Sequence, residues 1–339
     1  MVVRTNNVRA GRALPLDLFK TLLVAGMISA HVIQLITEEP PRWAWIWSDV
    51  VNLITFSGFM LAFGLGVGLS TERTRQRSLG ERAWPAIKML IAVWVSSFGF
   101  LLLVERATLD GWLIRELMMT EVLFGWSEFL TSFLVLYILL AIARPAFIWV
   151  ATRPTWLIAA SASALATTMV TTGADWPLIG GLIGHQGYPN FPVLSYLPWF
   201  LIGIHLGARW PWITAGEIAV GAAATGSFLL FLWQEGRLPE RFPPSLLWII
   251  GPGLPLALYL WTTEQAARWV PYPEVVLAAG RHVLASLVLS NLLIFSVRYV
   301  WGWPVVGAWE ILGTSLGLVV TVTLWGVLLS SLSSSTSRR

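Results

Sequence analysis

The sequence contains no cysteine, and only 12% of its 339 residues are charged. Without cysteine the chain has no disulfide, no thiolate nucleophile and no cysteine-ligated zinc or iron–sulfur cluster. Soluble domains carry roughly a quarter charged residues, which is far more than this chain has. Because a surface so poor in charge cannot face water over its whole area, the composition excludes a soluble globular enzyme.

Apolar residues are abundant, at 56% of the chain, and they give a mean hydropathy of +0.70. A helix needs about 20 apolar residues to cross the hydrocarbon core, and in lipid only helices of this length satisfy their own backbone. The apolar runs therefore predict an all-α, polytopic membrane bundle. About ten spans are expected, at 16–36, 46–70, 84–104, 129–151, 156–172, 193–208, 212–233, 246–262, 282–300 and 305–331.

We expect a single membrane domain over 1–339, with an N-terminal tail at 1–15 and a C-terminal tail at 333–339. The stretch 112–126 is apolar but short and charged, so it predicts an interfacial or re-entrant helix. The glycines and prolines at 251–255 predict a break in the helix that contains them, which is tolerated where the helix is buried or lines a cavity.

The positions of the basic residues orient this bundle. One set of loops and tails is rich in arginine: Arg4, Arg9, Arg12, Arg73, Arg75, Arg77, Arg82, Arg144, Arg153, Arg209, Arg268, Arg338 and Arg339. The opposite loops hold most of the acidic residues, such as Glu38, Glu39, Glu105, Asp110 and Asp175. The positive-inside bias places both termini in the cytoplasm. We expect the protein in the inner (plasma) membrane. The net charge of +4 then reflects topology, so no nucleic-acid partner is expected.

The first span carries three ionisable residues, which are costly in a membrane and count as functional candidates. Asp17 and Lys20 are three residues apart and share a helix face, so a boundary ion pair explains them as well as a function does. His31 follows on nearly the same stripe, about 16 Å further along the helix. An imidazole there is suited to proton transfer, and the alternative is a histidine bonded to a neighbouring helix.

The second span adds two candidates. Asp49 begins this span near the outer face and is placed to orient the His31 imidazole, whereas Ser57 lies deeper. Small residues follow at Gly64, Gly66 and Gly68, and close helix packing alone would explain them. The arginines after the span could bind a phosphate, or they are only the positive-inside signal. No two histidines share a ligand spacing, so no metal is expected.

Segment 12–31, RALPLDLFKTLLVAGMISAH, resembles the opening of the integral membrane acyltransferase superfamily. This superfamily includes the acyltransferase-3 proteins, the glucan succinyltransferase-like branch and the heparan-glucosaminide N-acetyltransferase-like branch. Leu16-Asp17 and His31 match its first-span pattern, and 56–59 is similar to its Ser-Gly-Phe signature. Further on, 197–203 with Gly207 is similar to its aromatic and glycine-containing span.

The last similarity lies before the ninth span, where Ala279-Gly280-Arg281 resembles the family's Leu-Gly-Arg element. The chain departs from the family at two places. Lys20 stands where the family has arginine, so the charge is kept but the bidentate fork is lost. Ser290 and Asn291 stand where the late element leads to a histidine or tyrosine.

The resemblance implies transfer of an acyl group, with acetyl expected, from cytosolic acyl-CoA such as acetyl-CoA. The acceptor would be a hydroxyl or amine of a glycan or lipid-linked cell-envelope molecule. His31 would act as general base or carry the acyl group transiently, and Ser57 would face the reaction cavity. Lys20 would hold the donor's phosphates together with Arg73, Arg75, Arg77 and Arg82.

Two other interpretations compete with this one. The departures at Lys20 and Asn291, the 21 tryptophans and the short polar loops also fit a non-catalytic subunit, packed as a homodimer or among other membrane proteins. A transporter would show inverted repeats, and no clear repeat is visible.

Overall fold

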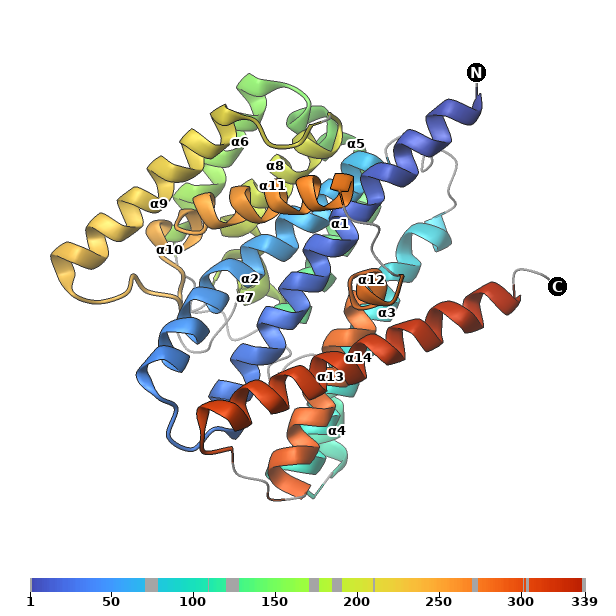
Figure 1. The fold of residues 1–339 in the computed structure, drawn as a ribbon, viewed down its shortest axis with the longest axis vertical. Helices are drawn as coiled ribbons and strands as arrows, with labels where there is room; N and C mark the ends of the chain where they lie inside the picture. Colours follow the sequence, from blue (N-terminus) through green and yellow to red (C-terminus); the bar gives the residue numbers. More distant parts are fainter. Residues whose placement is uncertain are drawn as a thin grey trace. The chain divides into compact units, whose positions relative to one another are not determined.

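The computed structural model describes residues 2–70, 79–108, 110–119, 128–170, 177–184, 191–209, 211–269, 274–300, 302 and 305–336. Within these residues every named element is helical, and β pairing is confined to two isolated bridges (Figure 1). The all-α prediction is confirmed, because these apolar runs satisfy their backbone groups within each helix.

The first half of the chain forms the helices α1 Val2–His31, η1 Val32–Ile36, α2 Arg42–Leu69, α3 Leu79–Phe100, η2 Leu101–Glu105, α4 Gly111–Met118, α5 Glu128–Ala151, α6 Pro154–Ala166, η3 Thr167–Met169 and α7 Pro177–Ile183. The second half forms α8 Val193–Gly207, α9 Ala215–Glu235, α10 Leu246–Ile250, α11 Gly253–Trp269, α12 Glu274–Arg281, α13 Val283–Phe295, η4 Ser296–Val300 and α14 Ala308–Thr336.

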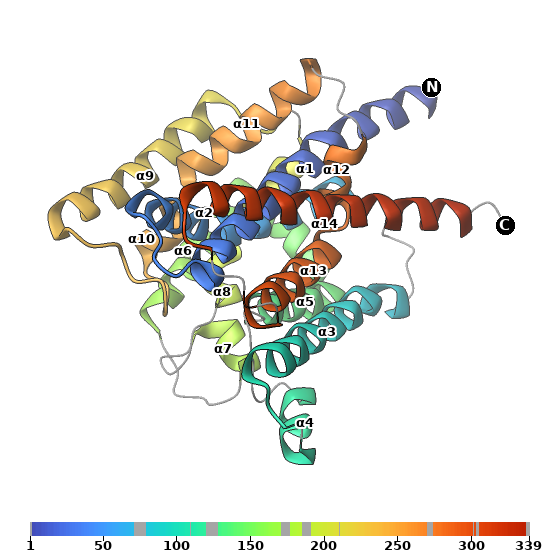
Figure 2. The ribbon, with the colours of Figure 1, turned by 60° about the horizontal axis from the view of Figure 1, so that its bottom comes forward.

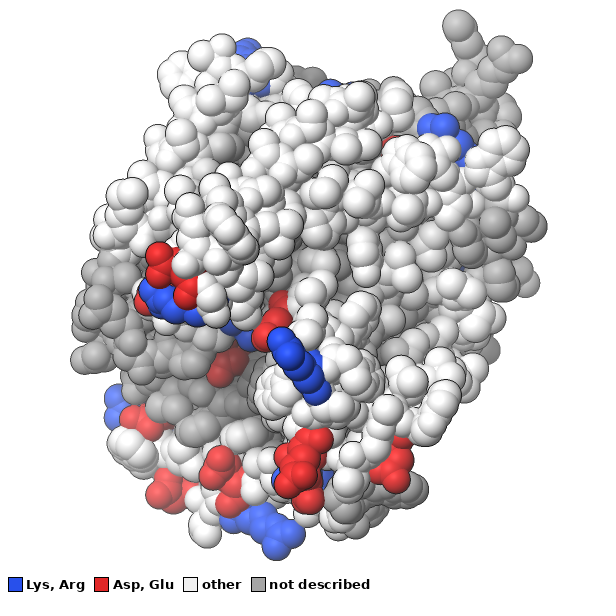
Figure 3. All heavy atoms as spheres, turned by 60° about the vertical axis from the view of Figure 1, so that its left-hand side comes forward, with Lys and Arg blue, Asp and Glu red and all other residues white. Residues whose placement is uncertain are grey.

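Eight segments of the described chain are long and apolar enough to cross a membrane, which indicates a multi-pass membrane protein. They are Leu14–Ile36, Arg42–Leu69, Ala83–Glu105, Glu128–Ala151, Ala215–Glu235, Leu246–Trp269, Val283–Val300 and Ala308–Leu332. The two other predicted spans, 156–172 and 193–208, correspond to the 13-residue α6 and the 15-residue α8. Figure 3 shows that most of the described atoms on the face in view belong to uncharged residues, as is typical of a membrane protein.

The structure bears on two predicted boundaries. The helix α1 begins at Val2, so most of the predicted tail at 1–15 is already helical. The stretch 112–126 contributes to the short helix α4, whose first turn is capped by Asp110 because its carboxylate accepts a hydrogen bond from the Leu113 amide at 2.7 Å. The part of this stretch after Met119 lies outside the described residues.

The chain forms two compact units, and the single domain over 1–339 stays a prediction. Unit 1 comprises Met1–Thr55, Leu102–Arg106 and Tyr259–Arg339, and unit 2 comprises Phe56–Leu101 and Ala107–Leu258. In unit 1, α1 packs on α12, α13 and α14, and α12 also packs on α14 (Figure 2). In unit 2, α5 packs on α3, α6, α7 and α8.

Glycines set the crossing of α2 and α8 inside unit 2. A Cβ added to Gly64 would lie 2.9 Å from the Cα of Gly203, and one added to Gly68 would lie 3.0 Å from the Cα of Gly207. Real Cβ atoms do not approach so closely, so both helices need glycine at these positions. The close packing predicted as one explanation of the small residues is therefore present.

The expected break falls between α10 and α11, at Gly251 and Pro252. The Thr225 hydroxyl donates to the Gly251 carbonyl at 2.7 Å and accepts from the Leu254 amide at 2.9 Å. The Trp199 indole donates to the Ile249 carbonyl at 2.8 Å. Side chains of α8 and α9 thus satisfy backbone groups that proline leaves without a helical partner.

Candidate functional site

The polar residues of α1 lie at two levels of unit 1. At the first level the Lys20 Nζ lies 2.8 Å from an Asp17 carboxylate oxygen, as their spacing predicts. The Arg281 Nε lies 3.4 Å from the other oxygen of the same carboxylate. Two cations therefore share one anion, which leaves one net positive charge among the three side chains. We call Asp17, Lys20 and Arg281 the charged cluster.

A close backbone contact holds the charged cluster together. The Thr21 hydroxyl donates to the Asp17 carbonyl at 2.9 Å and accepts from the Gly280 amide at 3.0 Å. A Cβ on Gly280 would overlap the Asp17 carbonyl oxygen, so only glycine lets α12 approach α1 this closely. Two of the sequence landmarks, Leu16-Asp17 and Gly280-Arg281, thus come together in space.

His282 adjoins the charged cluster at the start of α13. Its Nε2 lies 2.9 Å from the Ser330 hydroxyl, which joins the α12–α13 junction to α14. Partial burial, and then the positive charges of Arg281 and Lys20, lower the pKa of His282 below its ordinary value of 6.5, against the opposing effect of Asp17. This end of unit 1 therefore disfavours a further positive charge.

His31 forms the second level, at the other end of α1. The side chain is only 6% exposed, and its Nδ1 lies 3.1 Å from the Asn291 Oδ1 on α13. His31 is the last residue of α1 before the π-helix η1, and the hydroxyl of Thr37, directly after η1, donates to the Val32 carbonyl at 3.1 Å. Single π turns of this kind occur often at functional sites.

Asn291 is fully buried, and its Nδ2 has no hydrogen-bond partner among the described residues. Its serine neighbours on α13 are buried too, but they bond to backbone: Ser286 donates to the Ala279 carbonyl and Ser290 to the Leu287 carbonyl. An unpaired amide donor inside a membrane protein costs free energy, so this Nδ2 calls for an explanation.

Asp49 lies on α2 in unit 1 and is half-buried. Around it, two hydrogen bonds join α2 to the α1 and η1 segments: Trp47 to Ser29 at 2.9 Å and Gln34 to Ser48 at 2.6 Å. The orienting role of Asp49 toward His31 stays a prediction. The imidazole contact that the structure gives is to the Asn291 Oδ1, and sequence reasoning had noted Asn291 only as a departure from the family.

Of the other predicted site residues, Ser57 lies in unit 2 and the arginine side chains are not described. Ser57 belongs to unit 2, where it is buried and its Oγ has no hydrogen-bond partner among the described residues. Arg73, Arg75 and Arg77 lie outside the described residues, and so does the side chain of Arg82 on α3. Phosphate binding by these arginines stays a prediction.

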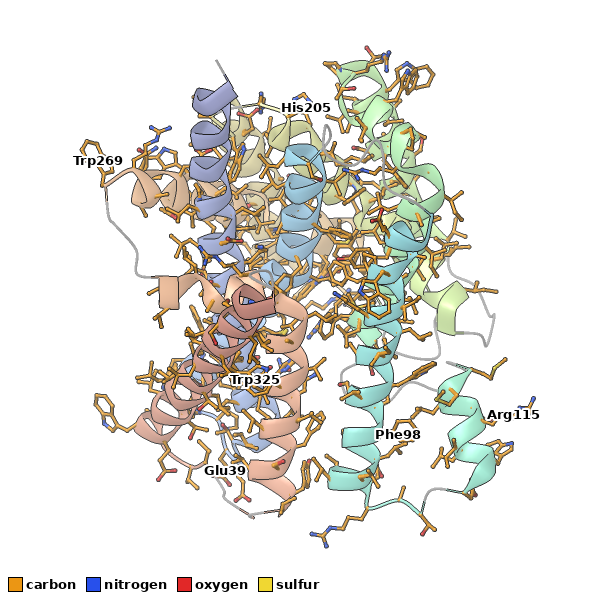
Figure 4. All side chains as sticks on the ribbon, turned by 90° about the vertical axis from the view of Figure 1, so that its right-hand side faces the viewer. Glu39, Phe98, Arg115, His205, Trp269 and Trp325 are labelled. Carbon is orange, nitrogen blue, oxygen red and sulfur yellow. The ribbon has the colours of Figure 1, made fainter. Side chains whose placement is uncertain are left out.

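Labelled residues show the two ends of each unit. In unit 1, Trp269 on α11 and Glu39 lie at opposite ends (Figure 4). In unit 2, His205 and Arg115 lie at opposite ends, and the His205 Nδ1 lies 3.0 Å from the Ala151 carbonyl oxygen (Figure 4).

Sequence reasoning missed Arg281 as a second partner of Asp17 and Asn291 as a partner of His31. The resemblance at 279–281 was a usable signal for Arg281, but nothing in the local sequence relates Asn291 to His31, 260 residues away. No family model matches the chain, and no curated protein matches it either.

Proposed function

We propose that the chain is an inner-membrane acyltransferase of about ten spans, with both termini in the cytoplasm. It moves an acyl group, acetyl in the simplest case, from a cytosolic acyl-CoA to a hydroxyl or amine of a glycan or other cell-envelope acceptor. The observation that carries this proposal is the buried imidazole of His31, held by a hydrogen bond from its Nδ1 to the Asn291 amide oxygen.

In the proposed reaction the His31 Nε2 takes the proton of the acceptor hydroxyl as its oxygen attacks the thioester carbonyl. The carbon–sulfur bond then breaks, and the imidazolium returns the proton to the departing thiolate of CoA. Lys20, Arg73, Arg75, Arg77 and Arg82 are assigned to the donor's phosphates. The net positive charge of the charged cluster supports this assignment for Lys20.

The test is acetyl transfer by purified protein in lipid nanodiscs, with radiolabelled acetyl-CoA and an extract of envelope glycans as acceptor. His31→Ala should abolish transfer while the protein still purifies as a folded species. His205→Ala is the matched control, because the His205 imidazole lies against the backbone carbonyl of Ala151 and has no role in the proposed reaction. Undiminished transfer by His31→Ala would remove His31 from the mechanism.

A non-catalytic membrane subunit is the second candidate, and one observation favours it. Asn291 already serves as a hydrogen-bond partner of His31, and Asp17 pairs with Lys20, as purely structural contacts would. This function predicts that the protein co-purifies with other membrane proteins and neither binds nor hydrolyses acetyl-CoA. Stoichiometric acetyl-CoA binding by the isolated chain would exclude it.

A further inference from the structure

The contact between His31 and Asn291 joins two groups of different hydrogen-bonding capacity. A neutral imidazole carries one N–H and one lone pair, on different nitrogens, and either nitrogen can hold the proton. The carboxamide oxygen of Asn291 has no hydrogen to donate. Because it lies 3.1 Å from the His31 Nδ1, this contact is a hydrogen bond only if the proton is on Nδ1.

We infer that Asn291 is a positioning residue that holds the His31 imidazole in the Nδ1–H tautomer, so that the basic lone pair is on Nε2. The catalytic consequence rests on the proposed function, but the tautomer does not. In water the Nε2–H form of histidine is the more common one, so the neighbouring helix reverses the intrinsic preference. Histidine bases in proteins are regularly oriented by a group bonded to their other nitrogen.

Asn291 is anchored well enough to act in this way. It is fully buried, and its helix α13 packs on both α1 and α14. Ser286, one and a half turns earlier on α13, donates to the Ala279 carbonyl at the end of α12. Leu287, Ile294 and Phe295 on the same helix are buried as well. This part of α13 therefore lies in the protein interior, so the Asn291 amide cannot rotate into solvent.

The chemistry also requires an amide, because both halves of the group are used. The Oδ1 accepts from His31, and the Nδ2 retains two hydrogens with no partner among the described residues. A carbonyl oxygen bound beside the imidazole would satisfy that donor, and its bond would strengthen as negative charge develops on the oxygen. An aspartate at this position could accept the hydrogen bond from His31 but could not donate one, and a leucine could do neither.

The tautomer is measured directly by nitrogen-15 NMR of histidine-labelled protein in nanodiscs, without substrate. The chain has four histidines, and the His31→Gln spectrum identifies the signals of His31 by their loss. The wild type should show a protonated Nδ1 and an unprotonated Nε2 for His31. Asn291→Leu should shift His31 toward the Nε2–H form, and Asn291→Asp should keep the proton on Nδ1.

Ser290→Ala is the matched control, because Ser290 is equally buried on α13 but bonds within its own helix. It should leave the His31 signals unchanged. An Nε2–H tautomer in the wild type, or identical His31 signals in the wild type and a folded Asn291→Leu variant, would overturn the inference. If Asn291→Leu does not fold, the wild-type spectrum alone decides.

Acetyl-transfer kinetics then separate this inference from the proposed function. If both hold, Asn291→Leu lowers kcat about tenfold or more with little change in KM, and Asn291→Asp moves the acidic limb of the pH profile. The predicted tautomer in a protein with no acyl transfer under any condition would leave the positioning role standing and remove the acyltransferase. Acetyl transfer that is lost in His31→Ala but does not depend on the tautomer would support the acyltransferase and remove the positioning role of Asn291.

Discussion

The Arg281 guanidinium lies 3.4 Å from the Asp17 carboxylate, although the two residues are 264 positions apart in the chain. The contact joins α12 to α1 and brings a second cation to an anion that Lys20 already pairs with. All three side chains are partly exposed, so solvent screens their interaction.

A double-mutant cycle on Asp17→Asn and Arg281→Gln should therefore give a coupling energy of no more than about 1 kcal/mol. Thermal unfolding in detergent at low and high salt provides the measurement, and the coupling should weaken as salt rises. A coupling of several kcal/mol would mean that the pair is fully desolvated, contrary to its exposure.

Replacing Gly280 by alanine should destabilise unit 1 much more than loss of the ion pair does. The added methyl group would overlap the Asp17 carbonyl, and relief of that overlap separates α12 from α1 at an expected cost of about 1–3 kcal/mol. Gly313→Ala on α14 is the control, because its Cβ would meet no atom within 4 Å. Equal melting temperatures for the two variants would refute the close contact.

The α2–α8 crossing in unit 2 should be as sensitive to a glycine-to-alanine substitution as the α1–α12 contact. Gly203→Ala places a methyl group 2.9 Å from the Gly64 Cα, so we expect a loss of about 1–3 kcal/mol or poor insertion and low yield. Gly66→Ala, two residues along α2 from Gly64, meets nothing within 4 Å and should behave as wild type. Fluorescence-detected size-exclusion chromatography after a heat step compares them.

The lowered pKa of His282 predicts that the free energy of unfolding depends on pH. Its pKa is lowered in the folded protein, so the unfolded chain binds more protons as pH falls below about 6.5. Stability should therefore rise with pH up to about 6.5 and then lose its dependence on this group. His282→Gln should flatten that part of the curve relative to wild type, as measured by thermal unfolding between pH 5 and 8. An unchanged slope would assign the titration to another group.

Long apolar segments were predictable, since twenty or so consecutive apolar residues need no tertiary information to indicate a membrane helix. The predicted spans 156–172 and 193–208 were harder, because a short apolar helix reads the same whether it faces lipid or protein. α8 has most of its residues buried in protein, and α6 ends in the 3-10 turn η3 after Ala166. Whether such a helix is buried depends on which other helices pack against it, and the local sequence does not show that.

The candidate site divides in the same way. The spacing of Asp17 and Lys20 placed them on one helix face, so their pairing followed from helix geometry alone. The contact of His31 with Asn291 did not follow, because Asn291 lies on a helix 260 residues later in the chain. The orienting role predicted for Asp49, which is closer along the chain, stays a prediction.

The local sequence by itself determined that this protein is helical and multi-pass, because the length of an apolar run is enough to indicate a membrane helix. It also singled out His31, because an ionisable side chain inside such a run is costly. Only the packing of α12 and α13 on α1 decided which groups share the Asp17 carboxylate and which amide faces His31. The first contact depends on Gly280, which lets the backbones of α1 and α12 meet, and the second on the packing of α13 against α1, and both are settled only when these helices pack together.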